Sequence, residues 1–230
     1  MKKFITIATA TILLNSGVSL AQIPELKTTM SGGKFYEAAL FKKGEINKSF
    51  YFIRHGQTDE NKYKVTPENL DVPLNEEGKV QAQKAAKILK NKNIKVIIAS
   101  TFTRAKETAA IINQELNVPI IYVDGLKEAN SGLVKGDDIR HNEKIKIWRN
   151  GGEVKGAESL YLFQKRIHST IKEVINKYDD VLIVSHGSYF WNLTILLNGE
   201  AIDTKNAAPY LFSPFSGNQG KELYKITPLT

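Results

Sequence analysis

The chain has 230 residues, 42% of them hydrophobic, a formal net charge of +8 at pH 7 and no cysteine. This length predicts one domain with a core large enough to be stable alone. The lack of cysteine excludes disulfides, thiolate metal sites and cysteine nucleophiles. The lysines are dispersed and no basic patch with interleaved aromatic residues is evident, so we expect small anionic substrates rather than nucleic acid.

Residues 1–21 have the layout of a secretory signal peptide. Met1-Lys2-Lys3 precedes an apolar and small-residue stretch over residues 4–20, and cleavage is expected after Ala21. Polar residues and a glycine interrupt the apolar run, which makes it a poor permanent membrane span. A buried N-terminal helix is the alternative. We therefore expect a periplasmic or secreted protein, whose mature chain starts with a linker or extension over residues 22–47 that has no assigned function.

A short aromatic and β-branched run over residues 50–53 predicts a buried strand. It ends at Arg54, His55 and Gly56. In an open α/β sheet, ligands bind at the carboxyl ends of the strands. Arginine offers a planar fork of donors that matches phosphate or carboxylate, and an imidazole can be neutral and nucleophilic near pH 7. The motif therefore indicates phosphoryl chemistry, although a surface arginine and histidine at a strand end remain an alternative.

The rest of the chain alternates between helical and strand patterns. Helices are expected from Asn75 as N-cap to about residue 90, over 103–116, from about 157 to 178 and over 188–198. Strands are expected over 94–99, 119–123 and 181–184, followed by a terminal strand pair over 206–212 and 222–227. The polar loop after Asn61 should lie over the cleft. The charged, glycine-containing segment from Asp137 to Gly156 reads as a lid that selects the substrate.

A second histidine follows the strand predicted over residues 181–184, in the turn Ser185-His186-Gly187-Ser188. If the two strands are neighbours in a parallel sheet, His55 and His186 face each other across one cleft. Of the other two histidines, His141 is either a plain surface residue or a side chain of the lid, and His168 is expected to have a structural role within a helix.

Several spaced motifs together resemble the histidine phosphatase superfamily, which includes the phosphoglycerate mutases. In chain order they are RHGQT at 54–58 followed by Asn61, the segment Ser100 to Thr108 with Arg104, then Glu128, and finally Ser185-His186-Gly187. The resemblance covers residues 48–230. It implies an α/β fold, namely a three-layer α/β/α sandwich with a mostly parallel central sheet.

The resemblance also implies residue roles. His55 is the expected nucleophile and Glu128 the expected proton donor. The expected substrate-binding residues are Arg54, Gly56, Gln57, Thr58, Asn61, Arg104, His186 and Gly187, of which Arg54, Arg104 and His186 are also expected to be catalytic. No metal and no cofactor are expected, because cations of the protein take the electrostatic role of a metal. The rim after Glu128 departs from the family pattern, so specificity is expected to depend on residues 129–157.

We therefore expect an exported phosphomonoester hydrolase that acts through a phosphohistidine intermediate on a small phosphorylated metabolite or glycan. A phosphoglycerate mutase is one alternative, but mutases of the family keep adjacent arginines after the glutamate, whereas here Arg140 and Arg149 are nine residues apart. A non-catalytic module that binds a phosphorylated ligand is another. A metal site of His55, His186 and Glu128 is disfavoured, because flanking arginines would repel a dication. Oligomeric state and substrate stay open.

Overall fold

The computed structural model describes residues 25–29, 32–66, 70–139, 141–216 and 222–230. In these ranges the centre of the molecule is a six-stranded sheet with the order β5-β4-β6-β3-β7-β8. Its strands are β3 (Phe50–Arg54), β4 (Val96–Ser100), β5 (Ile120–Val123), β6 (Val181–Ser185), β7 (Pro209–Ser216) and β8 (Glu222–Pro228). The first four strands in this order are parallel, whereas β7 is antiparallel to β3 and β8 to β7. The predicted α/β fold with a mostly parallel central sheet is confirmed.

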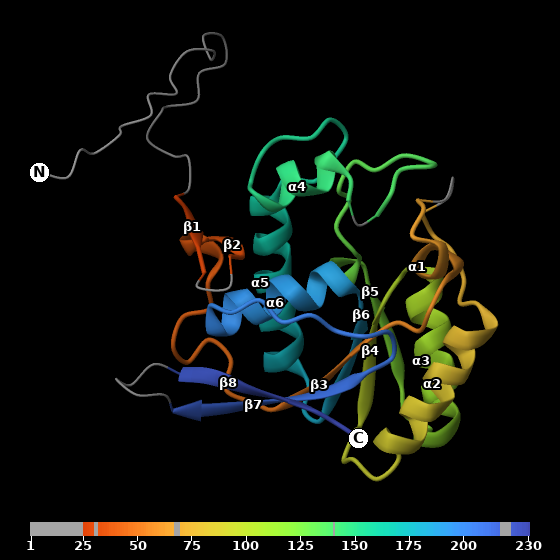
Figure 1. Ribbon diagram of the computed structural model, residues 1–230. Coiled ribbons are helices and arrows are strands. Elements are labelled where there is room, and N and C mark those ends of the chain that lie inside the picture. Colours follow the sequence, from red (N-terminus) through yellow and green to blue (C-terminus); the bar gives the residue numbers. More distant parts are fainter. Residues whose placement is uncertain (1–24, 30–31, 67–69, 140, 217–221) are drawn as a thin grey trace, which may run out of the picture.

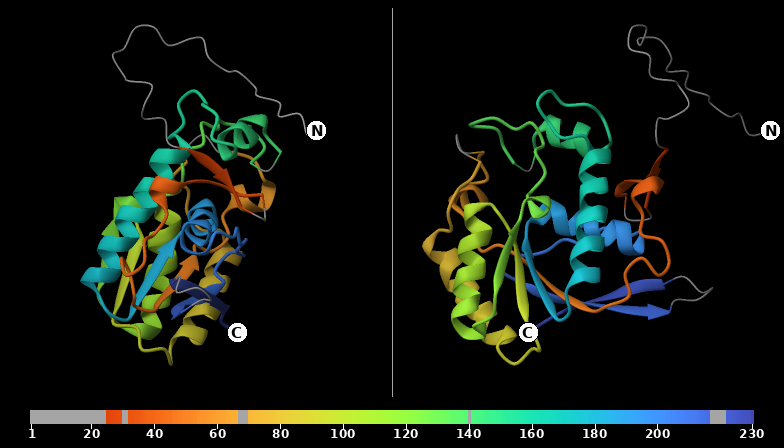
Figure 2. Two further views of the ribbon diagram at one scale, coloured as in Figure 1. Left: turned by 90° about the vertical axis from the view of Figure 1, so that its left-hand side faces the viewer. Right: turned by 180° about the vertical axis from the view of Figure 1, so that it is seen from behind.

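Helices cover both faces of this sheet (Figures 1 and 2). The helices α2 (Glu76–Leu89) and α3 (Thr103–Leu116) cover one face, and α5 (Leu160–Lys177) and α6 (Gly187–Asn198) cover the other. All five residues of β4 and of β6 are buried. In β4, Ile97 packs toward α2 and α3, whereas Ile98 packs toward α5 and α6, because successive side chains of a strand point to opposite faces. Two cores therefore sandwich the sheet.

The N-caps explain where the helices start. Asn75 caps α2 as expected, since its side chain accepts a hydrogen bond from the Gly78 N–H at 2.9 Å. Two short helices were not expected from the sequence, α1 (Asp59–Tyr63) and α4 (Glu143–Arg149). The described ranges also contain two 3-10 turns, η2 (Glu37–Ala39) and η3 (Asp124–Leu126). None of the helices in the described ranges has the length and apolar character needed to cross a membrane.

The segment expected as a linker or extension is packed against the domain. It forms a hairpin of β1 (Leu26–Thr28) and β2 (Lys34–Tyr36), which lies beside α5 and α6 (Figure 1). Ala39 and Ile46 from the same segment are buried in the core that contains α5 and α6. The predicted signal peptide, residues 1–21, lies outside the described residues.

Two glycines allow the loop after β3 to lie directly on α2. A Cβ atom added at Gly56 would lie 2.4 Å from the Gly78 carbonyl oxygen, which is well inside van der Waals contact. Conversely, a Cβ atom at Gly78 would lie 2.1 Å from the Gln57 carbonyl oxygen. Both clashes involve backbone, which cannot move aside as a flexible side chain can. The loop that carries His55 is therefore held against α2 by backbone contact.

We expect Gly78→Ala to destabilise the fold by about 2 kcal/mol or more, because overpacking of this kind typically costs 1–3 kcal/mol. Urea unfolding followed by circular dichroism measures this change. Gly44→Ala is the matched control: it has a φ of +78° and no atom within 4 Å of the added Cβ, so it should cost only about 1 kcal/mol for the left-handed backbone. Equal costs for the two variants would mean that the contact with the loop is not tight.

Candidate active site

The two histidines predicted to face each other do so. β3 and β6 are parallel neighbours in register, with Arg54 opposite Ser185. His55 and His186 therefore follow at the same edge of the sheet, and their ring centroids are 5.2 Å apart. The condition on which the expectation depended, that these two strands are parallel neighbours, is therefore met.

Hydrogen bonds determine which nitrogen of His55 carries the proton. His55 Nδ1 lies 2.7 Å from the Gly56 carbonyl oxygen. A carbonyl only accepts, so Nδ1 is the protonated nitrogen. The opposite nitrogen, Nε2, accepts a hydrogen bond from Arg104 Nε at 3.2 Å. Its lone pair is therefore directed toward the guanidinium, into the region where an anion would bind.

Two arginines lie beside His55, and both are largely desolvated. Arg104 is 5% exposed, donates through Nη1 to the Leu70 carbonyl at 2.8 Å, and lies over the Phe102 ring. It stands in the first turn of α3, where a cation opposes the helix dipole, so an anionic ligand nearby would relieve an unfavourable placement. Arg54 donates through Nη1 to the Thr204 carbonyl at 3.1 Å, while its Nε is buried without a partner among the described residues.

His186 lies behind His55 and is fully buried. Its Nε2 lies 2.8 Å from Ser100 Oγ at the end of β4, and its Nδ1 is buried without a hydrogen-bond partner among the described residues. A buried polar atom without a partner is costly, so a ligand atom that reached Nδ1 would be favourable, although His186 is not among the residues that line the cavity.

Glu128 follows η3 and is held by backbone N–H groups. Its Oε1 accepts from the Ala129 N–H and its Oε2 from the Ser188 N–H in the first turn of α6, both at 3.0 Å. These bonds fix the carboxyl group at the cavity wall. The site thus combines an imidazole lone pair, two guanidinium groups and one oriented carboxyl group.

The remaining expected binding residues divide into two groups. Asn61 and Gly187 line the cavity, and Gly187 lies against Arg54, since an added Cβ would be 3.2 Å from the Arg54 Cζ. Thr58 instead caps α1, where it exchanges hydrogen bonds with Asn61. Gln57 is turned toward α2: its side-chain oxygen accepts from Asn75 Nδ2 and its N–H donates to the Gln81 side chain. The backbone of Gly56 packs on Gly78, as described above.

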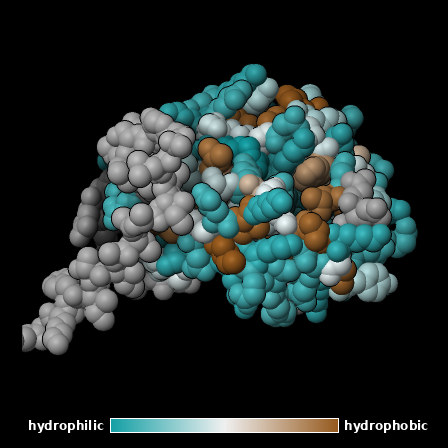
Figure 3. Space-filling model, turned by 90° about the horizontal axis from the view of Figure 1, so that it is seen from above, coloured by the Kyte–Doolittle hydropathy of each residue, from teal (hydrophilic) through white to brown (hydrophobic). Residues whose placement is uncertain are grey.

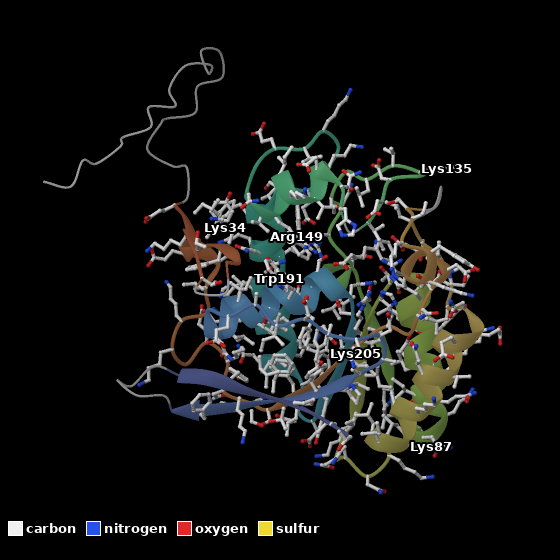
Figure 4. The ribbon with its side chains drawn as sticks, in the orientation of Figure 1. Lys34, Lys87, Lys135, Arg149, Trp191 and Lys205 are labelled. Carbon is white, nitrogen blue, oxygen red and sulfur yellow. The ribbon has the colours of Figure 1, made fainter. Side chains whose placement is uncertain are left out.

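The cavity in front of these residues has a volume of about 770 Å³. Its outer wall comes from the rim after Glu128 and from α4 and α6, including Leu133, Trp148, Arg149 and Trp191. The Arg149 guanidinium lies 5.7 Å from the centroid of the Trp191 ring, with the two side chains between α4 and α6 (Figure 4). Apolar side chains gather within a polar rim on this face of the molecule (Figure 3). The space is large enough for an ester whose leaving group is a small molecule.

Several cavity residues were missed by sequence reasoning. Glu60 lines the cavity one position before Asn61, and burial raises the pKa of its carboxyl group, although Arg104 opposes that shift. Asn206 was predicted to start a strand. That boundary was wrong: β7 begins at Pro209, and the Asn206 Nδ2 instead donates to the His55 carbonyl and to the Asn61 side chain, both at 3.0 Å.

The described residues contain no group of three or more His, Asp or Glu side chains placed to hold a metal ion. His55, His186 and Glu128, the ligands considered from the sequence, do not make up such a group. The two other histidines lie away from the cavity. His141 is exposed near Asp138, which favours the surface alternative for it, and His168 binds Glu45 at 2.8 Å, which agrees with the structural role expected for it.

We expect the folded state to lose stability as the pH falls from 7.5 to 5.5. Burial, then Arg104, hold the pKa values of His55 and His186 well below 6.5, so both stay neutral when folded. Below pH 6.5 the unfolded chain binds protons that the folded chain does not, which costs about 1.4 kcal/mol per histidine at pH 5.5. Urea unfolding at both pH values measures this loss. His55→Asn should remove about half of it; an unchanged loss would mean that this histidine is not held neutral.

The chain was compared with known proteins. Residues 50–209 match the family described as histidine phosphatase superfamily (branch 1). Phosphatase PhoE of Bacillus subtilis, described as uncharacterized, is 32% identical over 152 residues, which span 64% of this chain and 76% of the relative. A 2,3-bisphosphoglycerate-dependent phosphoglycerate mutase of Methylobacterium sp. is 32% identical over 176 residues, spanning 69% and 85%.

Solved structures share the fold. The mycobacterial glucosyl-3-phosphoglycerate phosphatase, in complex with VO3, superposes with a TM-score of 0.66 at 22% identity, covering 78% of this chain and 97% of that one. A phosphoglycerate mutase from Bacillus anthracis gives 0.64 at 21% identity, covering 81% and 95%. The family match spans more than half of the chain and includes His55, Arg104, Glu128 and His186. This chain is a member of the histidine phosphatase superfamily, with phosphatases and phosphoglycerate mutases among its relatives.

Proposed function

We propose that the chain is a phosphomonoester hydrolase that acts through a phosphohistidine intermediate on His55. The observation that carries the proposal is the state of this imidazole: Nδ1 donates to the Gly56 carbonyl, which leaves the Nε2 lone pair directed at the guanidinium of Arg104. A neutral nucleophile is thereby oriented at the place where two arginines would bind a phosphoryl group.

The reaction then proceeds in two steps. His55 Nε2 attacks phosphorus in line, and the bond from phosphorus to the ester oxygen breaks as Glu128 gives that oxygen a proton. Arg54 and Arg104 neutralise the charge on the non-bridging oxygens, and the neutral His186 can add a hydrogen bond; Arg54 Nε and His186 Nδ1, which have no partner among the described residues, are the donors that such oxygens would use. Water, deprotonated by Glu128, then attacks the phosphohistidine and releases inorganic phosphate. The proton lost by Glu128 in the first step is thus regained in the second.

The alternative is a mutase, which returns the phosphoryl group to a sugar-acid hydroxyl instead of water. Arg149 lines the cavity and could hold a substrate carboxylate. Arg140 lies outside the described residues. We favour the hydrolase, because the adjacent arginine pair of the mutases is missing from the sequence. Incubation with 3-phosphoglycerate and a bisphosphate primer separates the two: a mutase forms the 2-phospho isomer faster than it releases phosphate.

We also propose that residues 1–21 direct export and that the substrate is a small phosphorylated metabolite or glycan. The layout of the N-terminus and the size of the cavity support these points. N-terminal sequencing of the protein recovered from the periplasm or medium tests the first: the mature chain should begin at Gln22. Recovery of only the full-length chain from cytosol would contradict export.

The function is tested by phosphate release from a panel of phosphomonoesters, with and without a chelator. We expect release from at least one alkyl ester that the chelator does not inhibit. Loss of activity with chelator, restored by added metal, would contradict the metal-independent mechanism. Binding of phosphate esters without release of phosphate would instead favour a non-catalytic ligand-binding module.

A further inference from the structure

The N-terminal hairpin is hydrogen-bonded to one buried glutamine of α5. Gln164 is completely buried. Its side-chain oxygen accepts from the Tyr36 N–H, and its Nε2 donates to the Lys34 carbonyl, both at 2.9 Å. The hairpin precedes residues 50–209, which match the family, so this contact joins the family domain to a segment outside that match.

The same glutamine also contacts α6. Gln164 Nε2 donates its second hydrogen to Asn192 Oδ1 at 2.9 Å, and Asn192 Nδ2 donates to the Ser188 carbonyl at 2.9 Å. Asn192 is fully buried and lies at the wall of the cavity. Because the Lys34 and Ser188 carbonyls only accept, both amide groups have a single orientation that satisfies the chain of bonds. Gln164 therefore holds Asn192 in one orientation.

This chain of hydrogen bonds ends at the carboxyl group of the site. Asn192 braces the first turn of α6 through the Ser188 carbonyl, and the N–H of Ser188 donates to Glu128 Oε2 at 3.0 Å. The hairpin also lies against the turn that follows α4, since a Cβ added at Gly151 would lie 2.6 Å from Leu26 and 2.9 Å from the Tyr36 hydroxyl.

We propose that Gln164 is a positioning residue for Glu128, and that the N-terminal hairpin supports catalysis through its hydrogen bonds to Gln164. The inference rests on the proposed function, in which Glu128 protonates the leaving oxygen. Loss of Gln164 would let the first turn of α6 shift, and the Ser188 N–H would no longer hold Glu128 at the ester oxygen. Arg104 comes from α3 and has no role in this chain of hydrogen bonds, so it keeps its place.

This role predicts a dependence on the leaving group. An alkoxide such as that of glycerol 3-phosphate needs a proton to leave, whereas nitrophenolate is stable and leaves without one. A defect in proton donation therefore slows the alkyl ester far more than p-nitrophenyl phosphate. A general loss of folded protein would lower both rates by the same factor.

The test uses Gln164→Met, which keeps the length of the side chain and removes its three hydrogen bonds. We expect kcat for glycerol 3-phosphate to fall about 10- to 100-fold, and kcat for p-nitrophenyl phosphate to change by less than about 2-fold. His168→Gln is the matched control. His168 lies on the same helix and binds Glu45, which precedes β3, but it has no contact with Asn192. It should leave both rates unchanged, and equal losses on both esters in Gln164→Met would overturn the inference.

Two further measurements bear on the inference. Asn192→Leu should show the same selective defect. The Gln164→Met/Asn192→Leu double variant should lose no more activity than either single variant, because both residues act through the same chain of hydrogen bonds.

Hydrogen exchange of the Ser188 N–H does not require turnover: its protection should fall in Gln164→Met and persist in His168→Gln. Unchanged protection overturns the inference whatever the activity, whereas a wild-type chain that hydrolyses neither ester contradicts the proposed function instead.

Discussion

Replacing His55 with alanine should lower phosphate release by about 10⁴-fold or more, while the fold is kept. His55 is the only side chain in the proposed mechanism that forms a bond to phosphorus, so its loss removes the covalent intermediate altogether. Steady-state release from an alkyl phosphomonoester measures the effect. Acid-labile, base-stable labelling by a ³²P-ester should appear in the wild-type chain and be lost in the variant.

His141→Ala is the control for this experiment. His141 is an exposed histidine beside Asp138, and its replacement should leave both the rate and the labelling unchanged. Circular dichroism and urea unfolding verify that His55→Ala is folded. A folded His55→Ala variant that retains a near-wild-type rate would place the nucleophile elsewhere and refute the mechanism.

Replacing Arg104 with methionine should lower kcat/KM by about 10³-fold. Removal of one preorganised charge-stabilising donor typically costs 10²–10³-fold, and Arg104 additionally contacts the reacting nitrogen of His55 at 3.2 Å. The pH profile should change as well. Burial first, then Arg104 and Arg54, lower the pKa of His55, so loss of Arg104 raises that pKa. Since the neutral imidazole is the reactive form, the acid limb of kcat/KM should move to higher pH.

Arg104→Lys separates charge from geometry. Lysine keeps the positive charge that depresses the pKa of His55, but it cannot form the planar, bidentate hydrogen bonds that a guanidinium makes to a phosphoryl group. We expect an acid limb close to that of the wild type, with a rate that is still reduced. If Arg104→Met leaves the acid limb in place, then Arg104 does not set the protonation of His55 and the assigned contact is incorrect.

The sequence predicted the parts of the site that depend on strand ends. Two apolar runs followed by polar turns at His55 and His186 indicated two buried strands with a histidine at the carboxyl end of each, which would face each other if the strands were parallel neighbours. The structure bears this out through the register of β3 and β6. Arg104 was assigned from the resemblance and from its unfavourable place in the first turn of a helix.

The sequence could not reveal contacts between distant side chains. Gln57 was expected to bind substrate, but its direction depends on Asn75 and on the close approach of Gly78, neither of which has a local signal. Asn206 was read as the start of a strand, although it reaches back across 151 positions to the His55 carbonyl. Gln164 was one polar residue in a helical pattern, and nothing in that pattern showed that it is buried.

The short helices α1 and α4 were missed for a different reason. α1 has five residues and α4 has seven, too few for the apolar period of a helix to be recognised. α4 depends on tertiary contacts, such as the burial of Trp148 in the core that contains α5 and α6, whereas α1 buries no side chain and is capped locally by Thr58 and Asn61. Local propensity alone therefore understates the helical content of the cavity rim.

Because Gly56 packs directly on Gly78, the loop that carries His55 and the outer wall of the cavity differ in how well they tolerate substitution. The loop with His55 is bound by backbone contact to α2, so substitutions there disturb the fold and the chemistry together. The outer wall, by contrast, comes largely from one contiguous stretch, residues 129–157. Side chains of that stretch that line the cavity, such as Leu133 and Arg149, can diverge without altering His55 or Arg104. Descendants of such a chain can acquire new substrates while the reaction itself is inherited unchanged.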